Sequence, residues 1–181
     1  MSLNWREIDA ILAEIDPTSM HIERAVQPDF RNLYLWLYHP NRRAVLRICL
    51  EHPFVRLHRV SNPRRLKRSH QRFESFLAAR VKGGRIVRAE QLESDRIVLL
   101  EVHRSGETTR LYVRMWGPHA NIIATDRSDV ILDAFFRKPQ QGIATGFQFE
   151  PPVAGTTPPD KTIRPVEQGR SLNEQIEAEY G

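Results

Sequence analysis

The sequence predicts an α+β fold: a mostly antiparallel β-sandwich or barrel-like sheet with flanking helices. Short strand-like apolar runs recur at roughly ten-residue spacing, which is typical of antiparallel sandwiches and barrels. Turn signals separate these runs, such as RSGE at 104–107 and DRSD at 126–129. Two other stretches place apolar residues at helical spacing and supply the helices.

The first helix is predicted in LNWREIDAILAEI, residues 3–15, and Pro17 ends it. Its apolar side is formed by Trp5, Ile8, Leu12 and Ile15. Asn41 lies between the second and third strand-like runs that follow and indicates a hairpin. These three runs are HIERAVQ (21–27), NLYLWLYH (32–39) and RAVLRICL (43–50). The single cysteine, Cys49, lies in the third run, so we expect it to pack in the core.

The second helix is predicted in SHQRFESFLAARV, residues 69–81. Gly83 and Gly84 follow it and are typical of a helix C-terminus. KGGR at 82–85 is glycine-rich, but it follows a helix, whereas a phosphate-binding loop precedes one. Five strand candidates come next, at 85–91, 95–102, 109–116, 120–126 and 129–136.

We expect one domain over residues 1–138, followed by a segment of different composition. Residues 139–170 hold six of the 12 prolines and four of the nine glycines, which is typical of a linker or an extended arm. Ser171 and Glu174 have the spacing of a capping box, so a helix is predicted to begin in residues 171–181.

The positive charge is concentrated in one segment. The net charge is +5, yet residues 52–73 hold seven Lys and Arg, three His and no acid. Outside this segment the sequence has 20 of the 27 Lys and Arg residues and all 22 Asp and Glu residues, so the rest of the chain is slightly acidic. Such a local excess favours a polyanionic partner, most of all nucleic acid. A solvated basic loop with no partner explains the charge equally well.

No motif predicts catalysis. Nucleophile elbows, phosphate loops, HExxH and paired cysteines are absent from the sequence, and the seven histidines lack the spacing of metal ligands. We therefore expect no enzymatic activity, no cofactor and no metal. The sequence also has no signal peptide and no apolar run long enough to span a bilayer, so we expect a cytoplasmic protein without a membrane partner.

Three charged residues need an explanation. Asp9 lies close to the apolar stripe of the first helix, where a carboxylate requires a partner. Asp95 and Arg96 precede the apolar run IVLLEV, and as neighbours in a strand they face opposite sides of the sheet. They therefore cannot simply pair with each other. We hypothesise a contact between Asp9 and Arg96 across the boundary of helix and sheet.

Several motifs in one order resemble the N-terminal domain of the NFACT family, over about residues 3–138. They are REIDAILAEI, AVQPDF, FLAARVKGGRI, EQLESDRIV, LYVRMWGPHANIIATD and VILDAFF. This is the family of RqcH and of NEMF, known in bacteria under the older name fibronectin-binding protein A. The last ten residues before the final glycine, SLNEQIEAEY, are similar to the entry into the coiled coil of the family, here truncated.

The resemblance implies a fold like the N-terminal domain of formamidopyrimidine-DNA glycosylases. Those enzymes use an N-terminal Pro followed by Glu, whereas Ser2 and Leu3 stand here, so no glycosylase activity is expected. The resemblance further implies binding to the large ribosomal subunit with stalled peptidyl-tRNA, and recruitment of tRNA to add a C-terminal tail. The Asp-Arg pair associated with tailing falls on Asp95 and Arg96, and the characteristic acid of the first helix falls on Asp9.

The sequence departs from the family between the domain and the final helix. A helix-hairpin-helix module expected there looks deleted, and the basic segment is more basic than usual. One interpretation is that the segment replaces lost nucleic-acid contacts through Arg64, Arg65, Lys67 and Arg68. The alternatives are a fibronectin-binding surface adhesin, a DNA repair enzyme, and a scaffold domain in which the Asp-Arg pair is only structural.

Overall fold

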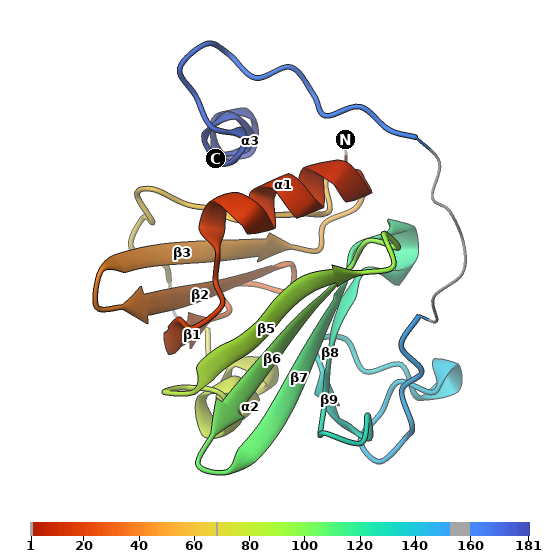
Figure 1. The fold of residues 1–181 in the computed structure, drawn as a ribbon. Helices are drawn as coiled ribbons and strands as arrows, with labels where there is room; N and C mark the ends of the chain where they lie inside the picture. The colour runs from red at the N-terminus through yellow and green to blue at the C-terminus, as the bar shows by residue number, and fades with distance from the viewer. Residues whose placement is uncertain (1, 68, 153–159) are drawn as a thin grey trace.

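The computed structural model describes residues 2–67, 69–152 and 160–181. They form nine strands in one antiparallel sheet with three α-helices, so the predicted α+β class is confirmed (Figure 1). The helices are α1 (Trp5–Ile15), α2 (Arg72–Arg80) and α3 (Leu172–Tyr180), with short 3-10 turns η1 (Gly117–His119) and η2 (Pro139–Gln141). The strands are β1 (His21–Val26), β2 (Asn32–His39), β3 (Arg42–Cys49), β4 (Arg56–Arg59), β5 (Arg85–Leu92), β6 (Ile97–Arg104), β7 (Glu107–Arg114), β8 (Asn121–Thr125) and β9 (Ile131–Ala134).

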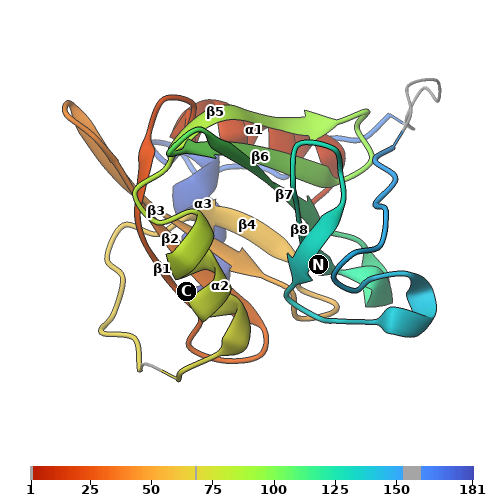
Figure 2. The same cartoon turned by 90° about the horizontal axis from the view of Figure 1, so that it is seen from below.

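The sheet consists of two halves that meet at a narrow joint. Its strand order is β4-β3-β2-β1-β5-β6-β7-β8-β9, so every neighbouring pair except β1–β5 is also consecutive in the chain. At that joint only His21 and Arg85 are paired in register. Both halves nevertheless contribute to one core, which contains Leu35 of β2 and Leu100 of β6. The sheet therefore bends at the joint around a shared interior (Figures 1 and 2).

Each of two helices, α1 and α2, contacts one edge strand and one central strand of the bent sheet. Helix α1 packs against edge strand β4 and central strand β5, while α2 packs against edge strand β9 and central strand β1 (Figure 2). Unpaired edges expose backbone donors and acceptors that promote aggregation, and covering elements limit this exposure. The two helices thus complete the core and shield both ends of the sheet.

Helix α1 begins at Trp5, two residues after the predicted start, and its C-terminal end is the predicted one. Asn4 caps it: its Oδ1 accepts from the Glu7 backbone N–H at 3.1 Å, and the Glu7 carboxylate accepts from the Asn4 N–H at 2.9 Å. Ile8 and Ile11 are fully buried on the apolar side. The helix ends at Ile15, just before Pro17, as predicted. Its N-terminus is therefore fixed beside the sheet.

The predicted turns between β2 and β3 and between β6 and β7 are confirmed, and so are the glycines that follow α2. His39 pairs with Arg42 across the β2–β3 turn, which contains Asn41. Ser105 and Gly106 have positive φ values of 50° and 79°, as the tight β6–β7 turn requires. At Gly84, an added Cβ would lie 2.5 Å from Val102 Cγ1, so the chain passes too close to β6 for any side chain.

The chain after β9 packs on the domain rather than only leading away from it. Ile143 and Phe149 lie in a second core, against Leu99 and Tyr112 on the outer face of the sheet. Further on, the guanidinium of Arg164 pairs with the buried carboxylate of Glu7 at 2.9 Å. The described parts of the predicted arm are therefore held against the sheet and against α1.

The last helix, α3, begins with the predicted capping box of Ser171 and Glu174. It packs on α1 and β4, with Ile176 fully buried. Glu14 of α1 accepts from the backbone N–H groups of Leu172 and Asn173 at 2.9 and 3.0 Å. A carboxylate at a helix N-terminus satisfies free N–H groups and interacts favourably with the helix dipole, so Glu14 stabilises the docking of α3.

Cys49 is buried in the core, as predicted. None of the helices formed by the described residues has the length and apolar character needed to cross a membrane.

Candidate nucleic-acid interface

Asp95 and Arg96 lie in the turn between β5 and β6, not at the entrance of a strand. Strand β6 begins at Ile97, and Leu92 pairs with Ile97 across the turn. Glu93, Ser94 and Arg96 have positive φ values of 49°, 55° and 55°. Such values are uncommon for residues other than glycine and reverse the chain within four residues. The predicted strand over 95–102 is thus wrong in its first two residues, because no glycine or asparagine signals this turn.

Gln91 holds the turn on α1. Its side-chain Nε2 donates to Asp9 Oδ1 at 2.8 Å and to the Trp5 carbonyl at 2.9 Å. Its Oε1 accepts from the Arg96 backbone N–H at 3.2 Å. The hypothesised contact between Asp9 and Arg96 is therefore wrong: among the described residues the two form no hydrogen bond or ion pair with each other. Instead, the Gln91 side chain links the Asp9 carboxylate to the Arg96 backbone N–H. The structure does bring Asp9 to the turn, and Gln91 is a residue that sequence reasoning missed.

The side chains of Asp95 and Arg96 remain available to a ligand. Within the part of the chain that the structure describes, neither makes a side-chain hydrogen bond or an ion pair, and Asp95 is exposed. Burial raises the pKa of Asp9, and the hydrogen bond from Gln91 opposes this shift. The turn thus presents a carboxylate and a guanidinium side by side on a backbone that is held in place.

A second arginine lies next to the turn. The Arg96 carbonyl accepts from the Met115 N–H at 2.9 Å, which joins the turn to the end of β7. Arg114 stands opposite Ile97 in register, donates from Nε to the His119 carbonyl at 2.7 Å, and lies over the Trp116 ring at 5.5 Å. Burial lowers the pKa of Arg114. The guanidinium of Arg114 and the indole of Trp116 therefore lie beside the β5–β6 turn and enlarge the surface that it offers to a ligand.

Only part of the basic segment at 52–73 is a charged surface. The segment contains strand β4, which was not predicted because Arg-Leu-His-Arg does not resemble a buried strand. Arg56 and His58 of β4 are buried, and Arg56 lies over the Tyr180 ring of α3 at 4.7 Å. Arg72 pairs with the buried Asp133. These three side chains serve the fold, so the predicted footprint is smaller than the sequence indicates.

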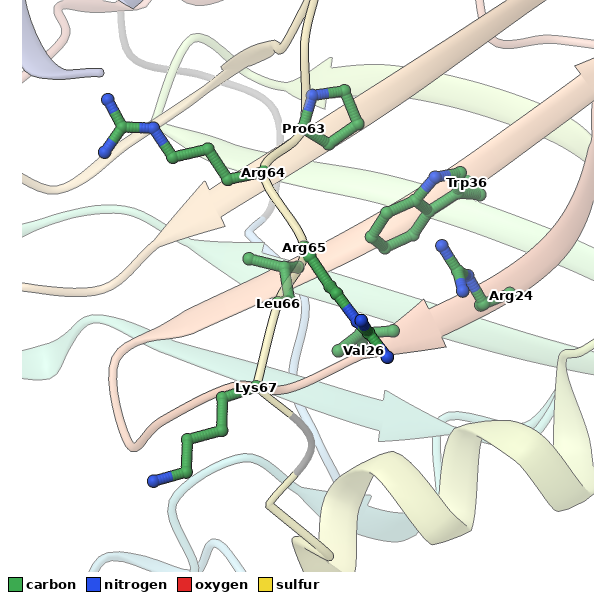
Figure 3. A pocket seen from close by; sticks show the side chains of 8 residues that line it. All are labelled: Arg24, Val26, Trp36, Pro63, Arg64, Arg65, Leu66 and Lys67. Carbon is green, nitrogen blue, oxygen red and sulfur yellow. The ribbon is translucent and has the colours of Figure 1, made fainter.

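The remaining charge lies on residues 61–67, which we call the basic strap. Arg64, Arg65 and Lys67 are exposed there, and Arg68 lies outside the described residues. The strap crosses the outer face of β1 and β2 and encloses a cavity of about 770 Å³ with Arg24, Val26 and Trp36 (Figure 3). The strap and the β5–β6 turn lie on opposite sides of the molecule (Figures 1 and 2). The predicted site residues therefore form two separate clusters.

The family model described as "NFACT N-terminal and middle domains" matches residues 7–178. This match confirms the resemblance inferred from the motifs. A comparison with curated proteins gives no match.

Among the solved structures that share the fold are two from streptococci and one from a staphylococcus. The N-terminal part of the fibronectin/fibrinogen-binding protein of Streptococcus suis has a TM-score of 0.73 and 21% identity, over 82% of this chain and 61% of that one. The fibrinogen binding protein of Staphylococcus aureus has a TM-score of 0.70 and 18% identity, over 84% and 57%. The N-terminal domain of the fibronectin-binding protein PavA of Streptococcus pneumoniae has a TM-score of 0.76 and 21% identity, over 90% and 69%. The chain thus spans less than two thirds of the first two structures.

Proposed function

Because the chain belongs to the family of NFACT N-terminal and middle domains, we propose that it is the RNA- and ribosome-binding domain of a ribosome-associated quality-control factor. In this proposal it acts in the cytoplasm on the large ribosomal subunit that carries a stalled peptidyl-tRNA. It helps to recruit tRNA for the addition of a C-terminal tail. It binds RNA and catalyses no reaction itself.

One observation carries this proposal: the β5–β6 turn presents Asp95 and Arg96 without partners among the described residues. The turn also carries backbone strain, because Glu93, Ser94 and Arg96 have positive φ values, which cost free energy for residues other than glycine. Functional sites are where such costs are usually found. A guanidinium is suited to this role because its fork of N–H groups binds phosphate oxygens and base edges.

The physical roles of the two side chains differ. Arg96 donates to a phosphate or to a base edge of the tRNA. Asp95 accepts from a base amino group or orients Arg96. Gln91 and Asp9 act through the backbone of the turn, since Gln91 binds the Arg96 N–H and Asp9 binds Gln91. They are therefore positioning residues. The basic strap, with Arg64, Arg65 and Lys67, adds attraction to phosphates on the opposite side of the molecule. Arg68, the next residue in the sequence, is also proposed to contact phosphates.

The binding of labelled tRNA to variants of the turn tests this proposal. We expect Arg96→Ala to weaken tRNA binding about tenfold or more, because a hydrogen bond to a charged group is worth about 1.5–3 kcal/mol. We expect Asp95→Ala to weaken it as well. Both variants should keep the thermal unfolding transition of the unchanged chain, because neither side chain has a partner in the described residues.

The matched control is Arg127→Ala, which removes an exposed arginine from the turn between β8 and β9. It lowers the net charge by the same amount at another place. If Arg127→Ala and Arg96→Ala lose the same affinity for tRNA, Arg96 contributes only general electrostatic attraction and no specific contact. Unchanged binding by folded Arg96→Ala would refute the role of the pair.

A second candidate is binding to fibronectin. It is favoured by the names of the similar structures, two of which include fibronectin. Immobilised fibronectin separates the two functions: saturable binding that survives Arg96→Ala, together with no affinity for tRNA, would favour the second candidate. Binding to tRNA alone would favour the first.

A further inference from the structure

The cavity under the basic strap has a chemistry that the fold does not require. The residues that line it are Arg24, Val26, Trp36, Pro63, Arg64, Arg65, Leu66 and Lys67. Four of these eight are cations, and no carboxylate is among them. Its volume of about 770 Å³ falls in the range of small-ligand sites, about 300–1,000 Å³. The lining therefore combines positive charge with an apolar and aromatic wall.

The wall is built around a stacked pair on two neighbouring strands. The guanidinium carbon of Arg24 lies 4.0 Å from the centre of the Trp36 ring. A register shift between Ile22 and Arg24 in β1 sets Arg24 opposite Trp36 of β2. Such irregularities redirect side chains. The result is a flat π and guanidinium surface on the sheet face that the strap crosses.

The strap brings further positive charge to this wall. In Figure 3 the side chain of Arg65 extends from the strap toward Arg24 and Val26, whereas Arg64 and Lys67 extend the other way. Among the described residues, none of these three strap side chains makes an ion pair or a hydrogen bond. Two guanidinium groups facing one cavity repel each other, and an anion between them removes this cost. The geometry thus favours a ligand with both a negative group and a flat apolar one.

We propose that this cavity binds an unpaired nucleotide of an RNA strand. The base packs against the Arg24–Trp36 stack, and Arg65 binds the phosphate beside it. Arg64 and Lys67 follow the phosphates of the strand outside the cavity. Bases of single strands are commonly held by aromatic rings or guanidinium planes together with a basic groove. This inference rests on the proposed RNA-binding function but concerns a different face of the molecule from the β5–β6 turn.

The test uses the whole chain and three labelled RNA probes of equal length: a single strand, its duplex, and a single strand with abasic sites. Fluorescence anisotropy gives each dissociation constant. We expect Trp36→Ala to weaken binding of the base-containing single strand about 5- to 100-fold, the range for loss of one stacked base. Binding of the abasic strand should change less than about twofold, because it has no base to stack.

Further variants separate stacking from charge and from damage to the fold. Trp36→Phe keeps an aromatic ring and should restore most of the affinity for the base-containing strand. Arg65→Gln should weaken the base-containing and abasic strands alike, and should reduce the salt slope of binding by about 0.7 for one phosphate contact on a single strand. The controls are Tyr38→Ala, an aromatic outside the cavity that Arg43 covers at 5.1 Å, and Arg127→Gln.

The outcomes are distinct. An equal loss for base-containing and abasic strands in Trp36→Ala, no loss for either, or tighter binding of the duplex than of the single strand overturns the nucleotide site. If tRNA binding still depends on Arg96 in that case, the proposed function stands without this site. If single strands bind as expected while Arg96→Ala has no effect on tRNA, the site stands and the role of the turn fails.

Discussion

Gln91 is the residue through which the β5–β6 turn is held on α1. Its amide satisfies three groups from three places in the chain: the Asp9 carboxylate, the Trp5 carbonyl and the Arg96 N–H. No sequence pattern signals this role, because a glutamine near the end of a strand is equally compatible with solvent. The turn was misassigned for a similar reason, since Glu93, Ser94 and Arg96 are not residue types that indicate positive φ.

Replacing Gln91 should loosen the turn and destabilise the chain. We expect Gln91→Leu to lower the free energy of unfolding by about 1–3 kcal/mol, because it leaves partly buried polar groups without partners. Urea unfolding measures this loss. The control Gln141→Ala changes an exposed glutamine of η2 and should have little effect. Equal unfolding midpoints for the two variants would show that the amide does not hold the turn.

His58 gives the chain a specific sensitivity to acid. It is fully buried in β4, and burial lowers its pKa to about 4, with Arg56 and Arg47 adding to the shift. The unfolded chain therefore binds a proton near the ordinary pKa of 6.5 while the folded chain does not. Stability is complete above this ordinary value and falls as the pH decreases toward the folded pKa.

Between about pH 7 and about pH 5 we expect the free energy of unfolding to fall by about 2 kcal/mol from His58 alone. Urea unfolding at the two pH values measures the difference. In His58→Leu this difference in the free energy of unfolding should nearly disappear. The control His70→Gln, which replaces an exposed histidine, should keep the full difference. A pH dependence that persists in His58→Leu would assign it to other groups.

At the scale of elements, periodicity predicted most of the fold and failed where charge and burial coincide. Runs such as NLYLWLYH became strands in the predicted places, because a short, nearly continuous apolar run is typical of a strand that is buried on both faces. Strand β4 left no such trace, since Arg56 is buried under the Tyr180 ring and His58 inside the core. Pairing of Arg24 with Trp36 depends on the register shift in β1, which sequence alone does not specify.

The docking of α3 depends on a cap supplied by another helix. Hydrogen bonds from Asn173 and Leu172 lower the pKa of Glu14 against the opposing effect of burial. We expect Glu14→Ala to destabilise the docked helix by about 1–2 kcal/mol, because two backbone N–H groups lose their acceptor. Hydrogen exchange over α3 should accelerate, while exchange in β6 should change little.

The control for this variant is Glu23→Ala, an exposed glutamate of β1. Acid should act in the same direction as the substitution, since a carboxyl with a lowered pKa loses its stabilising effect as the pH falls through its folded pKa. Exchange in α3 that is equally slow in Glu14→Ala and Glu23→Ala would mean that packing alone holds the helix.

At the scale of the whole molecule, the bent sheet separates two candidate RNA contacts. One face carries the β5–β6 turn against α1, and the other carries the basic strap over β1 and β2 (Figures 1 and 2). Contacts on two sides suit a domain that lies between two RNA surfaces, such as a ribosomal subunit and a tRNA. A single RNA hairpin would not be expected to engage both faces at once.

The most direct test of this account is co-sedimentation of the chain with large ribosomal subunits. Subunits carrying peptidyl-tRNA and empty subunits are pelleted in parallel, each with the unchanged chain and with Arg96→Ala. We expect the unchanged chain to enter the pellet preferentially with subunits that carry peptidyl-tRNA, and Arg96→Ala to lose this preference. Absence of the unchanged chain from both pellets, or equal recovery from both, would contradict it.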